Sequence, residues 1–228
     1  MIQVLPVEGM PEIRPGDEIA DLVAARVDLQ AGDVLVVTQK VVSKAEGRLE
    51  KVVDEEDRLR LIERESVRVL RRRDELVISE TRQGFVCANA GVDLSNVDQG
   101  VAALLPVDAD RSARHIRDAL AARTGVSVAV VVSDTFGRPW RRGLVDVALG
   151  CAGVAAIVDL RGTADTRGRT LQATEVAVAD ELASAAELVM GKDRDVPVAV
   201  VRGVDPSWLR EASVRTEIVR PHNEDLFR

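Results

Sequence analysis

The sequence predicts an α/β protein, a mixed α+β chain whose strands and helices belong to one domain over residues 1–228. Three observations lead to this prediction. Short runs are rich in Val and Ile, as buried strands are. Other stretches repeat apolar residues at spacings of three and four, which is typical of a helix with one buried face. No internal repeat, long Gly/Ser linker or shift in composition marks a boundary between domains.

The expected strands are short and recur along the whole chain. The clearest of them contains the unbroken apolar run at residues 128–132. The pattern does not order these strands within a sheet. The predicted strands are residues 33–42, 76–79, 84–88, 126–133, 154–160 and 196–202.

Four stretches show helical periodicity, at residues 17–27, 54–73, 112–123 and 174–190. The third carries an apolar stripe through Ile116 and Leu120, with polar residues opposite. The fourth is richer in Ala and Val, so we expect it to be mostly buried.

Composition excludes several functional classes. A net charge of −7 without a basic block is a poor match to nucleic acid, and an aromatic content of 2% leaves little for base stacking. No apolar run approaches the ~20 residues of a membrane helix, and the first residues do not resemble a signal peptide. Cys87 and Cys151 are expected to be buried, inert thiols. We therefore expect a cytoplasmic protein with neither nucleic-acid nor membrane partners.

Three predicted strands run into polar clusters, at residues 43–48, 89–96 and 134–143. Loops held at the ends of rigid strands commonly carry binding and catalytic groups. We therefore expect these three loops to form the functional site.

Carboxylates around these loops indicate a metal site. Asp93 and Asp134 each follow a buried strand, where an ionised carboxylate is costly unless it is paired or bound to a cation. Thr135 adds a hydroxyl, and Glu175 is expected to open a helix, where its charge complements the dipole. Mg²⁺ typically binds one or two carboxylates together with phosphate oxygens. Taken singly, each residue also fits a purely structural role in a turn or at a helix start.

Basic side chains in the same loops could hold phosphates. Lys44 follows a predicted strand, and Arg138, Arg141 and Arg142 lie beside glycines that let backbone amides approach a phosphate. Guanidinium groups bind phosphate oxygens in pairs. Lys192, by contrast, is expected only to belong to a turn that ends a helix.

Several familiar motifs are missing from the sequence. It contains no P-loop, no Rossmann fingerprint and no Gly-x-Ser-x-Gly nucleophile elbow. His115 and His222 have no suitable partner nearby in sequence. The remaining interpretation is metal-assisted phosphoryl transfer, in which a protein contributes alignment and charge neutralisation.

Six segments, which run in order along nearly the whole chain, resemble the coenzyme F420-0:L-glutamate ligase family. They are residues 5–11, 41–48, 89–96, 133–143, 174–181 and 197–203. Residues 223–227 are similar to the end of the ligase part of the two-domain actinobacterial members, in which a flavin domain follows. The resemblance therefore fits either the one-domain type or that N-terminal ligase domain.

This resemblance implies a ligase that adds L-glutamate to coenzyme F420-0 and extends a γ-linked oligoglutamate tail. GTP would phosphorylate the terminal carboxylate, and the glutamate amine would then displace phosphate from the acyl phosphate. The family also implies Mg²⁺ or Mn²⁺, with two ions per site, and K⁺ as a further candidate. It implies two interlocked subdomains with mixed sheets and an extensive homodimer.

The resemblance also assigns roles to individual residues. Asp93, Asp134, Thr135 and Glu175 match the metal-binding positions of the family. The matches to its nucleotide-contacting positions are Leu5, Pro6, Val7, Glu8, Gly9, Gln39, Lys40, Lys44 and Asn96. Family members carry small hydroxylated residues at the positions of Gln39 and Lys40, so here we expect backbone contacts. Asp134, Arg141 and Arg142 are expected to be catalytic, and the role of the two arginines toward phosphate or substrate carboxylates is inferred from the residues alone.

Two alternatives use the same residues. A non-catalytic nucleotide- or coenzyme-binding module would bind without turnover. A metal-dependent phosphatase would release phosphate without needing glutamate.

Overall fold

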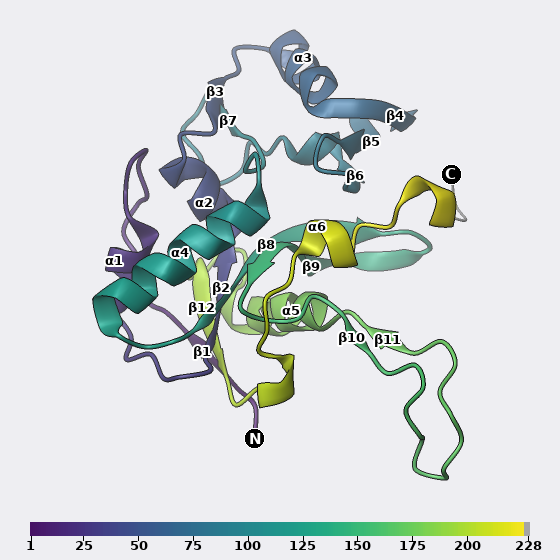
Figure 1. The fold of residues 1–228 in the computed structure, drawn as a ribbon. Coiled ribbons are helices and arrows are strands. Elements are labelled where there is room, and N and C mark those ends of the chain that lie inside the picture. The colour runs from purple at the N-terminus through teal and green to yellow at the C-terminus, as the bar shows by residue number, and fades with distance from the viewer. Residues whose placement is uncertain (226–228) are drawn as a thin grey trace.

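A five-stranded mixed sheet forms the centre of the protein, in a computed structural model that describes residues 1–225 (Figure 1). Its strands, in spatial order, are β1 (Gln3–Pro6), β12 (Val198–Arg202), β2 (Val34–Thr38), β8 (Ala129–Arg138) and β9 (Arg141–Ala152). Only β2 and β8 pair in parallel, whereas the other neighbours are antiparallel. The mixed α/β class is therefore confirmed. The last residues of the predicted segment 223–227, Leu226 and Phe227, lie outside the described residues.

Helices cover both faces of this sheet. The helices on one face are α1 (Ile19–Ala24), α2 (Gln39–Ala45) and α4 (Ala109–Thr124), while α5 (Val178–Met190) covers the other. Successive residues of a strand point to opposite faces of the sheet. Leu35 therefore packs in the apolar core on the α4 face, and Val36 packs in the core on the α5 face. A strand buried on both faces needs apolar residues at every position, which explains the unbroken apolar runs.

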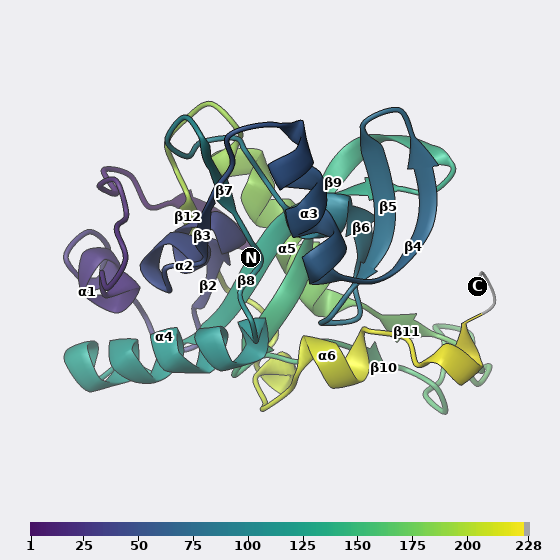
Figure 2. The same ribbon diagram turned by 90° about the horizontal axis from the view of Figure 1, so that it is seen from above.

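The segment between α2 and α4 forms a smaller layer of elements (Figure 2). It has its own apolar core around Ile62 and Leu104. Its elements are β3 (Leu49–Lys51), α3 (Glu55–Glu65), β4 (Ser66–Arg73), β5 (Leu76–Thr81), β6 (Val86–Ala88), the 3-10 turn η1 (Asn89–Gly91) and β7 (Val101–Ala103). They form a β4–β5–β6 sheet and a β3–β7 pair. The loop after η1 carries Asp93, so this layer supplies one wall of the site described below.

The remaining elements follow β9. The antiparallel pair β10 (Val158–Asp159) and β11 (Glu175–Val176) carries a ribbon that extends from the body in Figure 1. The other short elements are η2 (Pro206–Trp208), α6 (Val214–Glu217) and η3 (His222–Glu224). In the described part of the chain, no helix has the length and apolar character needed to span a membrane.

Several predicted elements are confirmed. The strands predicted at 76–79, 84–88, 126–133 and 196–202 and the helices predicted at 17–27 and 112–123 all have observed counterparts. Cys87 and Cys151 are buried free thiols, and burial raises the pKa of each to about 12.

The predicted helix 54–73 was wrong in its second half. The helix ends at Glu65, and Ser66–Arg73 is strand β4, paired antiparallel with β5. Arginines and leucines favour a helix locally, but pairing with a neighbouring strand overrides such a preference.

The strand predicted at 33–42 was wrong in its last part. The strand stops at Thr38, and Gln39 begins α2, where Ser43 Oγ donates to Gln39 Oε1 at 2.9 Å. The polar segment 43–48 is thus partly helix rather than loop.

The prediction of a loop at residues 134–143 was also wrong. Strand β8 continues through Asp134 to Arg138, and β9 returns from Arg141, so most of residues 134–143 form a hairpin. In the segment predicted as strand 154–160, only Val158–Asp159 is strand.

Candidate active site

The sequence segments expected to form the site converge at one edge of the central sheet. Strands β1, β2 and β8 run in the same direction, because β1 and β2 are each antiparallel to β12 and β8 is parallel to β2. Their carboxyl ends therefore share an edge, with Thr38 opposite Ser133. The chain enters β12 at the same edge, so the loop after α5 also arrives there. The carboxyl edge of parallel strands is where open α/β sheets bind ligands.

Asp93 and Lys40 form an ion pair at this edge. Lys40 Nζ lies 2.7 Å from Asp93 Oδ2 and also donates to the carbonyl and hydroxyl oxygens of Ser95. Asp93 Oδ1 accepts the Ser95 backbone N–H at 2.7 Å. Burial alone would raise the pKa of Asp93, but these hydrogen bonds outweigh it and hold the pKa below its usual value. Asp93 is therefore an ionised carboxylate with a fixed orientation.

Asp134 lies next to this pair and has a very different electrostatic environment. Burial raises its pKa from the usual 3.8 to about 7, against a hydrogen bond from the Thr135 backbone N–H. The charges of Asp93 and Asp146 raise the pKa further, whereas that of Lys192 lowers it. The surroundings of Asp134 balance its negative charge only partly, so a cation would be favoured beside it.

Asp146 and Lys192 were not predicted, yet they complete the cluster. Asp146 lies on β9 opposite Thr135 and is 2% exposed. Its carboxylate accepts the hydroxyls of Thr135 at 2.5 Å and Ser133 at 3.1 Å. The Lys192 ammonium contacts the Thr135 hydroxyl and lies 3.9 Å from Asp146 Oδ1. Asp146 could have been noticed as a charge within an otherwise apolar strand. Lys192 was interpreted only as part of a helix-ending turn, which is confirmed, and that interpretation did not predict its contact with Thr135.

The carboxylates of Asp93 and Asp134 fit a divalent ion whose other ligands would be phosphate oxygens of a substrate. In residues 1–225, no three His, Cys, Asp or Glu side chains gather closely enough to hold a metal. Asp93 nevertheless lies close enough to Asp134 for its charge to raise the pKa of Asp134. Two carboxylates completed by phosphate oxygens are a usual Mg²⁺ environment.

Glu175 does not join this cluster. Glu175 is an exposed residue on β11 and pairs with Arg161 at 3.2 Å. The expectation that it opens a helix was wrong, because α5 begins at Val178. The short β10–β11 pairing takes up residues 175–176 before the helix can start, and its assignment as a metal ligand stays a prediction.

The residues predicted to contact a nucleotide lie around the same edge. Leu5 and Pro6 end β1, Val7 is buried, and Glu8 and Gly9 are exposed in the segment that follows. Gly9 has a φ of 70°, which favours glycine, and its carbonyl accepts Arg26 Nε at 2.6 Å.

The other predicted contact residues come from α2 and the loop after η1. Lys44 Nζ lies 2.5 Å from Glu12 Oε1, which ties α2 to the segment after β1. Gln39 is buried, and its side chain accepts from the Ser43 hydroxyl, so its backbone contact with a nucleotide stays a prediction. Asn96 is exposed on the loop that carries Asp93.

The hairpin arginines do not reach the aspartates in this structure. Arg138 lies opposite Arg141 in the strand pairing at the tip of the hairpin, and its guanidinium donates to the carbonyl of Arg142 at 2.7 Å. Arg138 is four residues beyond Asp134, or about 13 Å at the usual strand rise. Arg141 and Arg142 are exposed, and their catalytic role stays a prediction that would need a substrate spanning this distance.

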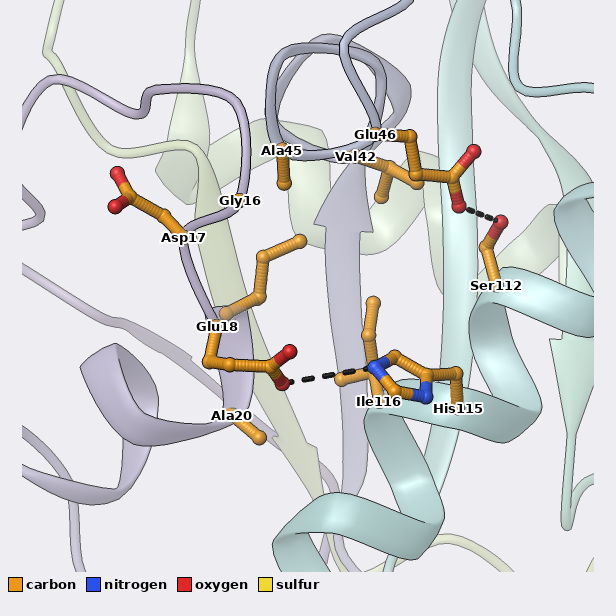
Figure 3. A pocket seen from close by; sticks show the side chains of 11 residues that line it. Gly16, Asp17, Glu18, Ala20, Val42, Ala45, Glu46, Ser112, His115 and Ile116 are labelled. Atoms are coloured by element: carbon orange, nitrogen blue, oxygen red, sulfur yellow. Dashed lines mark hydrogen bonds and ion pairs between the residues drawn. The ribbon is translucent and has the colours of Figure 1, made fainter.

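A separate small cavity lies between α1, α2 and α4 (Figure 3). It measures about 110 Å³, with Ser112 donating to Glu46 and His115 Nε2 lying 3.5 Å from Glu18 Oε2. These polar groups already pair with one another across the cavity. We therefore locate the candidate site by its carboxylates and lysines rather than by this cavity.

Together, the fold and the site define an α/β protein with an acidic, lysine-containing site at the carboxyl edge of its central sheet. Residues 9–203 match the family described as F420-0:Gamma-glutamyl ligase, and the chain belongs to this family. It is therefore a ligase.

Relatives of this family match the chain over its whole length. It is 44% identical to the coenzyme F420:L-glutamate ligase of Methanothermobacter thermautotrophicus, over 100% of this chain and 99% of the relative. It is 42% identical to the protein of the same name from Methanopyrus kandleri and 40% identical to that from Archaeoglobus fulgidus. Those matches also cover 100% of this chain, with 98% and 96% of the relatives.

Proposed function

We propose that this chain adds L-glutamate to coenzyme F420-0 in a reaction that uses GTP and a divalent ion and passes through an acyl phosphate. The main support is a full-length similarity to relatives named coenzyme F420:L-glutamate ligase. The observation that links this activity to the site is the pair Asp93 and Asp134, coupled in charge at the sheet edge where the predicted nucleotide segments end.

The chemistry explains why such a site is needed. The terminal carboxylate of F420-0 is a poor acyl donor, so it must first be phosphorylated. Its oxygen attacks the γ-phosphorus of GTP, the bond from this phosphorus to the β,γ-bridging oxygen breaks, and GDP leaves with the electron pair. The glutamate amine then attacks the acyl carbon, the C–O bond to phosphate breaks, and one amine proton is released. The first step brings two anions together, so its barrier depends on charge neutralisation.

In this proposal, different residues bind the metal ion, orient its ligand and bind the nucleotide. Asp93 and Asp134 would hold Mg²⁺ or Mn²⁺, which supplies charge screening between the substrate carboxylate and the phosphates. Lys40 keeps Asp93 ionised and oriented through its 2.7 Å contact. Residues 5–9, Lys44 and Asn96 would hold the nucleotide around the same edge. K⁺ activation and the homodimer belong to the same proposal, and light scattering of the purified protein tests the dimer.

Mass spectrometry of the products tests the proposed reaction. Incubation with F420-0, L-glutamate, Mn²⁺ and GTP should add glutamyl units to the coenzyme and release one GDP for each. Parallel reactions with ATP test the nucleotide preference, and reactions without glutamate test for the phosphatase alternative. Asp134→Asn should abolish turnover, whereas Asp118→Asn, at an exposed position of α4, should not. Unmodified coenzyme after incubation with the wild-type protein would contradict the proposal.

A further inference from the structure

The tip of the β8–β9 hairpin carries a tryptophan in an unfavourable backbone conformation. Pro139 and Trp140 form the two-residue turn between Arg138 and Arg141, and Trp140 has a φ of 60°. Residues other than glycine rarely occupy this left-handed region, because their Cβ crowds the backbone. The turn itself would therefore favour glycine, yet it holds a large aromatic residue that is 86% exposed. A strained backbone that presents an exposed ring indicates that the ring has a use outside the turn.

This tryptophan lies in a positively charged segment of an acidic chain. Residues 136–145 contain three arginines and no Asp or Glu, although the whole chain has a net charge of −7. Arg138 fixes the tip, since its guanidinium donates to the carbonyl of Arg142 at 2.7 Å. Arg141 and Arg142 are exposed, and among the described residues neither guanidinium is held by a carboxylate. Two guanidinium groups beside an exposed indole are suited to a ligand that has both an anionic group and a flat ring.

The order of the strands separates this hairpin from the predicted nucleotide segments. Strand β1, which runs into residues 5–9, is one edge of the central sheet, and β9 is the other. Strand β2 ends opposite Ser133, and from Asp134 onward β8 and β9 continue together past the rest of the sheet (Figure 1). A nucleotide held beside β1 and α2 would leave the hairpin to the second large substrate.

The chemistry and length of F420-0 match this surface. The molecule has a flat deazaflavin ring at one end, a ribityl chain and a phosphodiester in the middle, and the reacting carboxylate at the other end. About ten covalent bonds separate the ring from that carboxylate, which is ~11–12 Å in an extended chain. The strand between Asp134 and Arg138 covers about 13 Å. A carboxylate near Asp134 would therefore place the ring near the tip.

We propose that Trp140 stacks on the deazaflavin ring of F420-0 while Arg141 and Arg142 bind its phosphodiester, so that the terminal carboxylate is directed toward Asp134. The nature of the ligand rests on the proposed function. The two arginines then bind substrate at a distance from the metal site, and the hairpin selects a long carboxylate that carries a ring.

Tryptophan fluorescence measures this contact without turnover, with Mg²⁺ and a β,γ-imido GTP analogue present. Trp140 and Trp208 are the two tryptophans of the chain, so Trp208→Phe leaves Trp140 as the emitter and Trp140→Phe leaves Trp208. F420-0 should quench the emission of Trp140 strongly and that of Trp208, which packs against the core, much less.

Calorimetry and kinetics test the contribution of the ring. Trp140→Gly should keep the melting temperature, because the turn favours glycine, but weaken F420-0 binding about ten- to hundredfold. It should raise the KM for F420-0 by a similar factor and leave the KM for GTP unchanged. Trp140→Phe should restore most of the affinity. Leu188→Ala, which removes another exposed apolar side chain, should behave as the wild type.

The arginines are tested by the dependence of binding on salt. Arg141→Gln combined with Arg142→Gln should weaken F420-0 binding at low ionic strength and reduce its sensitivity to salt, because ions screen exposed charges. A salt dependence equal to that of the wild type would remove the arginines from the inference.

Three results would overturn the inference as a whole. They are unchanged Trp140 emission with F420-0, wild-type affinity in Trp140→Gly, or equal increases in the KM values for F420-0 and GTP. If F420-0 binds through Trp140 but gains no glutamyl unit, the proposed function fails and the binding role stands. If Trp140→Gly forms product with an unchanged KM for F420-0, the inference fails and the proposed function stands.

Discussion

Replacing Asp134 with Asn should stabilise the metal-free protein at alkaline pH. Burial raises the pKa of Asp134 from 3.8 to about 7. At 1.36 kcal/mol per unit of pKa, this difference corresponds to at most about 4 kcal/mol of destabilisation once the group is ionised. Asp134 keeps some contact with solvent, which hydrates the charge, so we expect about 2 kcal/mol.

The sign of the pH dependence follows from proton binding. Between about pH 4 and pH 7 the folded protein holds the Asp134 proton more tightly than the unfolded chain does. The contribution of this group to the free energy of unfolding therefore falls as pH rises through that range and is constant above it. An asparagine at this position has no proton to lose, so the difference between variant and wild type isolates Asp134 from all other titrating groups.

Urea denaturation of the metal-free proteins at about pH 3.5 and at pH 8 measures this difference. The two proteins should have similar free energies of unfolding at about pH 3.5, below the pKa of the unfolded chain, and Asp134→Asn should be more stable by about 2 kcal/mol at pH 8. Mn²⁺ with nucleotide should stabilise the wild type but not the variant, because a ligand stabilises only the state that binds it. A variant that is less stable at pH 8, or a difference independent of pH, would refute this account of the site.

Two further substitutions test the framework around the site. Gly150→Ala should destabilise the protein by about 1–3 kcal/mol in thermal or urea unfolding, because a Cβ there would overlap the backbone of Ala109. Gly137→Ala, where a Cβ meets open space, is the matched control, and equal losses in both would contradict the packing argument. Asp146→Asn should cost about 1–3 kcal/mol in the same measurement, since Thr135 loses its charged acceptor. An unchanged midpoint for that variant would show that the carboxylate is not needed to order β8 and β9.

The predicted fold was most accurate where local pattern and burial agree. The run at 128–132 is a central strand because apolar residues at every position suit burial on both faces. The pattern failed at Ser66–Arg73, where residues that favour a helix form strand β4 through pairing with β5. It also failed after Ser133, because the polar residues that suggested a loop continue the strand, with Thr135 bonded across to Asp146.

Part of the site could be predicted in the same way, and part could not. Asp134 stood out as a carboxylate that follows a buried strand, and Asp93 as one in a polar loop. Lys192 had no comparable signal, because its contact with Thr135 joins residues 57 positions apart. The environment that gives Asp134 its raised pKa likewise comes from residues brought together by folding.

The apolar patterns in the chain were enough to predict the α/β class and most of the buried strands, and six short segments carried the family resemblance, since both depend on residue types at short spacings. Which strand ends meet was decided by the fold, through the parallel pairing of β2 with β8 and the placement of β12 between β1 and β2. The difference is physical. Periodicity reports how each segment buries its own apolar side, whereas the charge balance around Asp134 depends on Coulomb interactions among groups that only tertiary contacts bring within a few ångströms.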